Sequence, residues 1–106
     1  MRIAYREICM RLGSDKRFRM WSAPVDTQSE QGALYARKVG GAAPPMELAT
    51  LLERINGRHV VTRACFEAHV ARIVQCAELF FTGRDEESMR NVARSHTLMD
   101  LSLIHI

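Results

Sequence analysis

The sequence predicts an all-α protein, a small orthogonal bundle of five to six helices in a single domain. Apolar residues recur three and four positions apart along most of the chain, which is the helical period, and almost no segment alternates as a strand does. Glycine, proline and capping residues occur where these periodic segments end. A chain of 106 residues, of which 47% are hydrophobic, has room for one core of modest size.

The first quarter of the chain contains two of these helices. In RIAYREICMRLG the spacing of the apolar side chains predicts a helix over residues 2–13. Its inner face is expected to carry Tyr5, Ile8, Cys9 and Leu12. The next segment, SDKRFRMWSAP, begins with two residues that can cap a helix and ends at Pro24, so it holds a short helix at most.

The middle of the chain predicts two more helices joined by a short connection. Thr27 and Glu30 have the spacing of a capping box, and the helix that they begin continues to about Val39. Gly32 in its first turn weakens this helix by up to ~1 kcal/mol relative to alanine. GGAAPP forms an ordered connection, and PPMELATLLERING predicts the clearest helix, which Gly57 ends. Its apolar stripe consists of Leu48, Leu51, Leu52 and Ile55.

The C-terminal half predicts an extended segment, RHVV, followed by two long helices. Thr62 caps the first helix, and Thr82–Gly83 break it. One face of this helix is expected to be lined by Phe66, Val70, Ile73, Ala77 and Phe80. The last helix covers residues 84–99, with acidic residues in its first turn, where they meet the positive end of the helix dipole. Its inner side is expected to carry Met89, Val92, Ala93 and His96.

The terminal residues LSLIHI, 101–106, are predicted to be a non-native tail on a domain of residues 1–100. They alternate where the preceding helix has a period of 3.6, and codons for them fit CTG TCT CTT ATA CAC ATC, which is similar to adapter DNA of sequencing libraries. Appended segments of this kind are excluded from functional reasoning. On this interpretation the chain is truncated and the natural protein continues beyond Asp100. The alternative is a genuine apolar terminus that docks in the core or on a partner.

Basic residues are concentrated toward the N-terminus. The net charge is +3, but residues 1–43 carry +4 and residues 44–106 carry −1, and thirteen of the fifteen basic residues are arginine. Because a guanidinium fork matches phosphate oxygens, this half predicts contact with a nucleic-acid backbone. The predicted nucleic-acid-binding residues are Arg2, Arg6, Arg11, Lys16, Arg17 and Arg19. Codon usage in a GC-rich genome is the competing explanation of the arginine excess.

Two short motifs have competing interpretations. KRFRMW places Phe18 and Trp21 among basic residues, so the rings are either core anchors, which we favour, or surfaces that stack on bases. Cys65 and His69 are four apart on one predicted helix, where two side chains can meet one metal ion. We favour packing of a thiol and a satisfied histidine beside an apolar face, and therefore predict no metal site.

Other classes of function are disfavoured. The sequence has no glycine-rich phosphate loop, no GxSxG elbow and no HExxH motif, so we expect neither an enzyme nor a cofactor. No apolar run is long enough to span a membrane, and three cysteines without paired spacing indicate free thiols in a reducing, cytoplasmic compartment. The expected function is a small helical regulator that binds DNA or another nucleic acid. The alternative is a helical protein-interaction module, a homo-oligomer or a subunit of a larger assembly, without catalytic activity.

One segment resembles a known family. LYARKVGGAAPP, residues 34–45, with Leu12–Gly13 upstream, is similar to part of the C subunit of the flagellar master transcription regulator (FlhC-like), where a Leu-Tyr pair, a glycine and a Pro-Pro pair occur at similar offsets. The resemblance implies an all-helical DNA-binding activator that works in a hetero-oligomer. It also implies a cysteine-ligated zinc near the C-terminus, but none of the family's zinc ligands is assigned to this chain.

Overall fold

The computed structural model describes residues 2–26, 28–40, 45–60 and 62–104, except for the side chains of residues 2 and 3. These residues form five α-helices and one 3-10 helix, and no strand occurs among them, so the predicted all-α class is confirmed. In chain order the helices are α1 (Arg2–Gly13), η1 (Lys16–Trp21), α2 (Glu30–Val39), α3 (Leu48–Asn56), α4 (Arg63–Phe80) and α5 (Glu86–Ile104).

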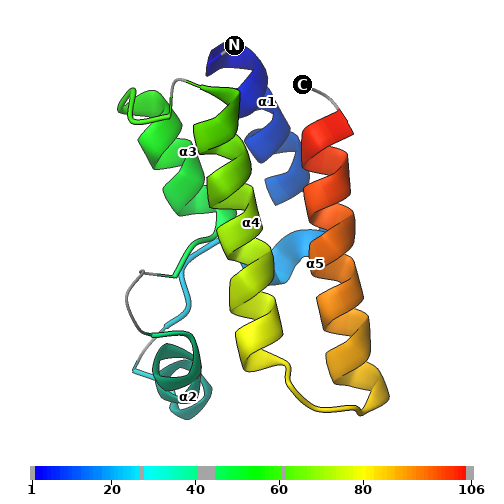
Figure 1. Cartoon of the computed structure of the whole chain (residues 1–106). Helices are drawn as coiled ribbons and strands as arrows, with labels where there is room; N and C mark the ends of the chain where they lie inside the picture. Colours follow the sequence, from blue (N-terminus) through cyan, green and yellow to red (C-terminus); the bar gives the residue numbers. More distant parts are fainter. Residues whose placement is uncertain (1, 27, 41–44, 61, 105–106) are drawn as a thin grey trace.

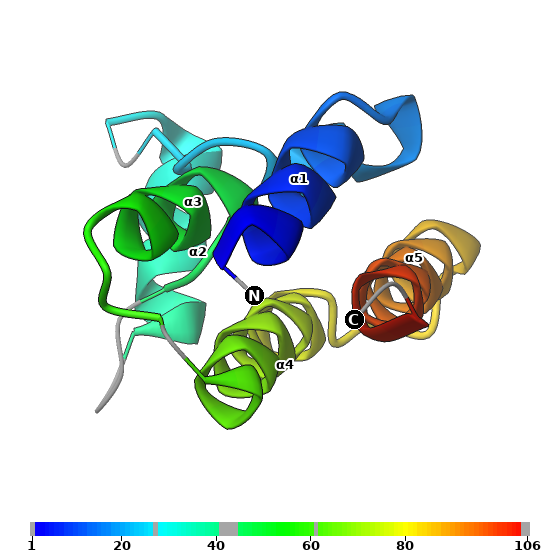
Figure 2. The same cartoon turned by 90° about the horizontal axis from the view of Figure 1, so that it is seen from above.

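Two helix pairs make up most of the fold. α1 packs on α3, and α4 packs on α5 as an antiparallel hairpin (Figure 1). Seen from above, the two pairs face each other across the core (Figure 2). η1 joins α1 to the side of α5, and α2 packs mainly on α4. The start of α1 and the end of α5 lie at one end of the molecule, whereas α2 and the α4–α5 connection lie at the other (Figure 1).

The core is built from the faces that the sequence predicted for α1 and α3 and for most of α4. All four predicted inner residues of α1 are buried, and Tyr5 stacks on Phe66 of α4 with 4.6 Å between ring centroids. Phe18 and Trp21 are buried in the same core, which confirms them as core anchors. The cysteines are free thiols, as predicted. Burial raises the pKa of Cys9 to about 12, because the apolar core disfavours the thiolate.

α2 and α3 begin later than predicted. Thr27 lies outside the described residues, and the side chain that caps α2 is Ser29, whose hydroxyl accepts from the backbone N–H of Gly32 at 3.0 Å. α3 begins at Leu48 and is capped by the Glu47 carboxylate, so its prolines precede the helix instead of occupying its first turn. Of the predicted connection GGAAPP, residues 41–44 lie outside the described part of the chain.

The predicted inner side of α5 is wrong. Met89 is 61% exposed, Ala93 is exposed, and His96 lies on the surface 3.6 Å from the Glu78 carboxylate. The buried residues of this helix are instead Asn91, Ser95, Leu98 and Ser102. The two serines satisfy their hydroxyls on carbonyls of their own helix, at 2.6 Å for Ser95 and 2.7 Å for Ser102. They can therefore face the core without an unpaired polar group.

The helical conformation of α5 also continues past Asp100. α5 extends to Ile104, where the sequence predicted an alternating tail, and Leu101 packs against the core while Ser102 is buried. The last two residues of the tail lie outside the described part of the chain. That these residues are non-native stays a prediction. No helix of the described chain is long and apolar enough to cross a membrane.

Candidate functional site

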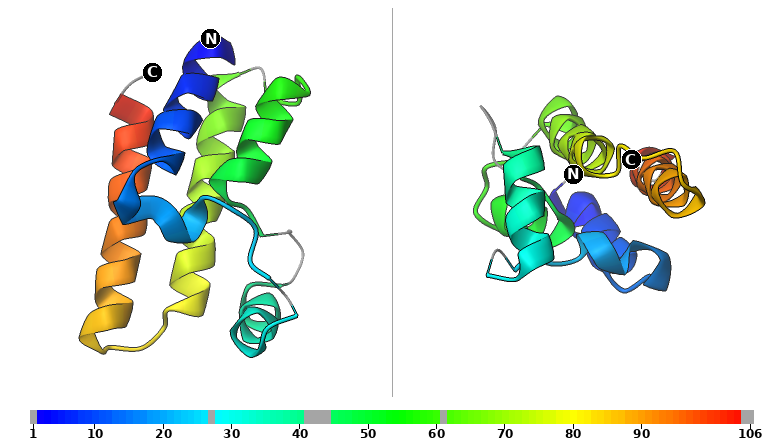
Figure 3. Two further views of the ribbon diagram at one scale, coloured as in Figure 1. Left: turned by 180° about the vertical axis from the view of Figure 1, so that it is seen from behind. Right: turned by 90° about the horizontal axis from the view of Figure 1, so that it is seen from below.

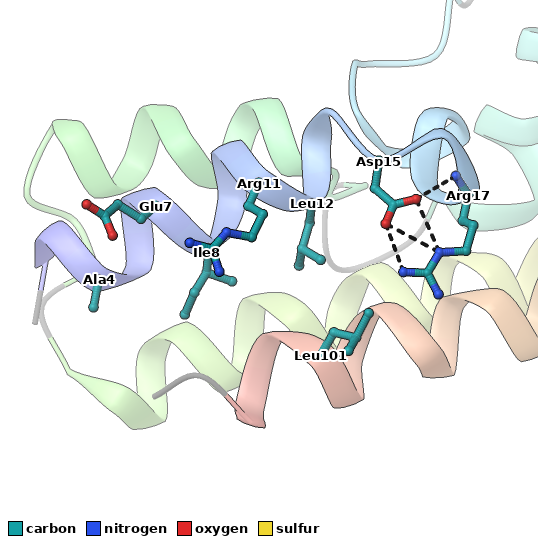
Figure 4. Close-up of a pocket in the computed structure, with 8 residues that line it drawn as sticks. All are labelled: Ala4, Glu7, Ile8, Arg11, Leu12, Asp15, Arg17 and Leu101. Atoms are coloured by element: carbon teal, nitrogen blue, oxygen red, sulfur yellow. Dashed lines mark hydrogen bonds and ion pairs between the residues drawn. The ribbon is translucent and has the colours of Figure 1, made fainter.

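The structure distributes the predicted nucleic-acid-binding residues over more than one surface. Arg6, Arg11, Lys16, Arg17 and Arg19 are all exposed, whereas the side chain of Arg2 lies outside the described part of the chain. Arg11 and Arg17 line a cleft of about 400 Å³ between α1, η1 and the end of α5 (Figure 4). Arg6 lies on α1 but does not line this cleft.

The α1 cleft is not purely basic. Glu7 and Asp15 line it together with the two arginines, and Arg17 donates to both Asp15 oxygens, with the shortest distance at 2.8 Å (Figure 4). These hydrogen bonds lower the pKa of Asp15 because they stabilise its carboxylate. Arg17 therefore already has an anionic partner on this side. A phosphate group in this cleft would meet acidic as well as basic side chains.

A second groove collects Lys16 and Arg19 of the predicted residues, together with Arg17. η1 lies across α5 (Figure 3, left), and the groove of about 440 Å³ beside this crossing is lined by Lys16, Arg17, Arg19, Met20, Trp21, Asn91 and Arg94. We refer to it as the basic groove. Arg94 was not among the predicted residues, because it is more than 70 positions from η1 and no local pattern relates the two.

Cys65 and His69 lie together, but their surroundings suit packing. The His69 Nδ1 lies 2.7 Å from the Cys65 carbonyl oxygen. A carbonyl only accepts, so His69 donates from Nδ1, and its Nε2 faces the Arg54 guanidinium at 3.5 Å. Within the described residues no group of three or more His, Cys, Asp and Glu side chains is placed to hold a metal ion.

A cavity rich in aromatic side chains lies where η1, α2, the end of α4 and the start of α5 meet. Its volume is about 250 Å³, and four aromatic side chains line it: Trp21, Tyr35, Phe80 and Phe81. The rings brace one another, because Phe80 contacts Tyr35 edge-on at 5.2 Å and Phe81 at 4.9 Å between centroids. We refer to this cavity as the aromatic pocket.

α2 forms one wall of the aromatic pocket and is fixed to α4 at its C-terminal end. Lys38 donates to the carbonyl of Phe80 at 3.3 Å and lies 5.4 Å from the centroid of its ring. Arg72 of α4 donates to the carbonyl of Val39 at 3.2 Å. At the other end, Gly32 faces Asp26, and a Cβ on this glycine would lie 1.7 Å from the Asp26 carbonyl oxygen. The wall thus depends on a glycine that propensity disfavours.

The polar side chains of the aromatic pocket are acidic or uncharged. Of the described residues that line it, none is basic, although the chain as a whole carries a positive net charge. Glu47 is already engaged in capping α3, where it accepts hydrogen bonds from the Thr50 N–H and hydroxyl. Burial, followed by the neighbouring Cys76 and Glu47, raises the pKa of Tyr35, so its hydroxyl stays neutral. Asn91 is buried, and its amide forms no hydrogen bond within the described structure.

No pattern in the sequence predicts this pocket as a unit. Its walls come from four helices, so its residues share no spacing, and the tyrosine and phenylalanines are equally typical of an ordinary core. Trp21 and Phe80 were predicted only as core residues, and Tyr35 was named only within the resemblance. Trp21 has two roles, because it is buried in the core and also lines the aromatic pocket.

The sequence is similar over most of its length to part of a larger plant protein. No protein-family model matches this sequence. Over 101 residues, 95% of the chain, it is 32% identical to the ATPase family AAA domain-containing protein At1g05910 of Arabidopsis thaliana. The chain spans 8% of the length of that relative.

This similarity corrects two expectations. The resemblance of residues 34–45 to the flagellar regulator is wrong, because these residues lie within a match that covers nearly the whole chain and leads to a different protein. Leu34 and Tyr35 are adjacent residues of α2, and such pairs recur in unrelated helices. The expectation that the chain is not an enzyme is also wrong, because the relative is named as a member of an ATPase family.

Proposed function

We propose that this chain is a helical recognition module that receives a side chain of a protein partner in the aromatic pocket. The observation that carries the proposal is the lining of the pocket, which combines four aromatic rings with acidic or uncharged polar groups and no basic residue among those described. A concave, mostly apolar cavity with a few convergent polar groups is the usual form of a binding site. Its volume of about 250 Å³ suits one side chain better than a large cofactor.

The chemistry of the pocket favours an apolar stem with an uncharged polar end. The rings offer apolar area to the stem, and the Asn91 amide offers a donor and an acceptor that have no partner in the described structure. An anionic end would meet Glu47 and Glu87 with no basic side chain to offset them. A cationic end would find Glu47 already engaged by Thr50 and Glu87 exposed to solvent.

The similarity to an ATPase family protein supports a role inside a larger protein. We propose that the chain presents a bound partner to an ATPase of that family. DNA binding through the N-terminal arginines stays a second proposal, and it is tested by the loss of duplex affinity with rising salt. The α1 cleft has mixed charge, because Glu7 and Asp15 accompany its two arginines. The structure therefore supports DNA binding less than it supports binding of a side chain in the aromatic pocket.

Titration with peptides that differ in one side chain tests the proposal. Lysine, N-acetyl-lysine and glutamate at one central position provide cationic, uncharged and anionic ends on apolar stems. Trp21 is the only tryptophan and lines the pocket, so its fluorescence reports on occupancy. We expect saturable binding that is tightest for the uncharged end. Equal affinity for all three peptides, or no change in Trp21 fluorescence, would contradict the proposal.

A matched pair of asparagine variants locates the contact. Asn91→Ala removes the buried amide and should weaken the best peptide by about three- to tenfold, the usual value of one hydrogen bond. Asn56→Ala removes an exposed amide at the end of α3 and should leave the affinity unchanged. Equal losses in the two variants would argue against binding in the aromatic pocket.

A further inference from the structure

The basic groove and the aromatic pocket adjoin each other. Met20, Trp21 and Asn91 line both cavities, so the two cavities share part of their lining. The groove has the opposite electrostatic character. Among its described lining residues are four basic side chains and no carboxylate.

Three of the four basic side chains have no anionic partner. Arg17 is paired with Asp15, but Lys16, Arg19 and Arg94 form no ion pair within the described part of the chain. All four are exposed at their helix surfaces and converge from η1 and α5 on one depression. Like charges held near each other repel, and an anion placed between them relieves that repulsion.

The charge reverses on the other side of the aromatic pocket. Glu87 lines the pocket at the start of α5, next to Glu86 and close to Asp85. Glu87, Asn91 and Arg94 are separated by four and three residues, which places them on one face of α5. At 1.5 Å per residue, this face changes from acidic to basic over roughly 10 Å, a length that about three extended residues cover.

We propose that the basic groove binds an acidic residue of the same partner segment whose side chain fills the aromatic pocket, two or three positions away from the inserted residue. This inference rests on the proposed function and adds the charge pattern of the partner. A protein segment fits the site better than a nucleic acid. The phosphates of a nucleic acid recur at every nucleotide and would meet Glu87 and Glu47 as well as the arginines.

Three peptides test the proposal with the full chain. Each carries N-acetyl-lysine at the centre, flanked two and three positions away by alanines only, by two glutamates on the N-terminal side, or by two glutamates on the C-terminal side. Because the direction of the segment is not fixed by the groove, one acidic peptide should bind about three- to tenfold more tightly than the alanine peptide, and the other should not. The advantage should shrink as salt is raised from 50 to 500 mM, because these charges are exposed.

Single arginine variants assign the effect to the groove. Arg94→Ala should abolish most of the advantage of the acidic peptide and leave the affinity for the alanine peptide unchanged. Arg6→Ala removes an exposed arginine of α1 that does not line the groove, and it should preserve the advantage. Circular dichroism of both variants checks that they are folded.

The outcomes separate this inference from the proposed function. If the alanine peptide binds but neither acidic peptide gains affinity, the inference is wrong while the proposed function stands. If no peptide binds, both are wrong. If duplex DNA binds, loses affinity with Arg94→Ala and displaces the peptides, while acidic residues give no advantage, the groove serves phosphate backbones and the inference is overturned.

Discussion

At the scale of single residues, Gly32 shows how a local preference is overruled by a close approach. Propensity counts glycine against α2, yet the backbone of Asp26 passes so near that no larger residue fits. The same residue lines the aromatic pocket. The chain before α2 and the pocket wall are therefore fixed by one contact that hydrophobic periodicity does not reveal.

Gly32→Ala should lower the free energy of unfolding by about 1–3 kcal/mol, because the added methyl group would lie 1.7 Å from the Asp26 carbonyl oxygen and the backbone must move. The measurement is urea denaturation followed by circular dichroism. Gly13→Ala is the control, since a Cβ there meets nothing within 4 Å and alanine favours the helix. A Gly32→Ala protein as stable as the Gly13→Ala protein would mean that the Asp26 contact is absent.

At the scale of elements, amphipathic periodicity predicted α1 and α3 well and misplaced the buried face of α5. α1 and α3 bury large aliphatic and aromatic side chains, so hydrophobicity marks their inner faces directly. α5 buries Ser95 and Ser102, whose hydroxyls bond within the helix, and exposes Met89. Polarity alone cannot distinguish a buried serine of this kind from one in solvent.

Paired leucine substitutions test which face of α5 is buried. Ser95→Leu should destabilise the protein by about 1–3 kcal/mol, because Ser95 is fully buried and the site holds no room for three more carbons. Ala93→Leu places the same side chain on the exposed face and should change stability by less than about 0.5 kcal/mol. Thermal unfolding of the two variants is the measurement. The reverse order would restore the face predicted from hydrophobicity.

At the scale of the whole molecule, the sequence was sufficient for the fold class but not for the site. The Cys65–His69 pair was identified from the sequence because both residues lie on one helix. Lys16, Arg17 and Arg19 were identified for the same reason, since all three lie on η1. The aromatic pocket and Arg94 were missed because tertiary packing alone brings α5 to η1 and α2 to α4. Sites assembled from distant segments leave no spacing to read.

Truncation after Asp100 tests the predicted domain boundary. The shortened chain should keep its helical circular dichroism spectrum, but lose about 1 kcal/mol of burial with half-buried Leu101 and buried Ser102. For a chain of this size that loss corresponds to a decrease in Tm of about 4–8 °C. A truncated chain without a cooperative thermal transition would show that residues 101–106 are an integral part of the fold.

The placement of α2 and the α4–α5 turn opposite the start of α1 and the end of α5 has a practical consequence (Figure 1). A tether joined ahead of α1 or behind α5 would emerge at the end of the molecule opposite α2 and the α4–α5 turn, which contribute to the aromatic pocket. Immobilising the protein through either end should therefore leave the aromatic pocket accessible to a bulky binding partner.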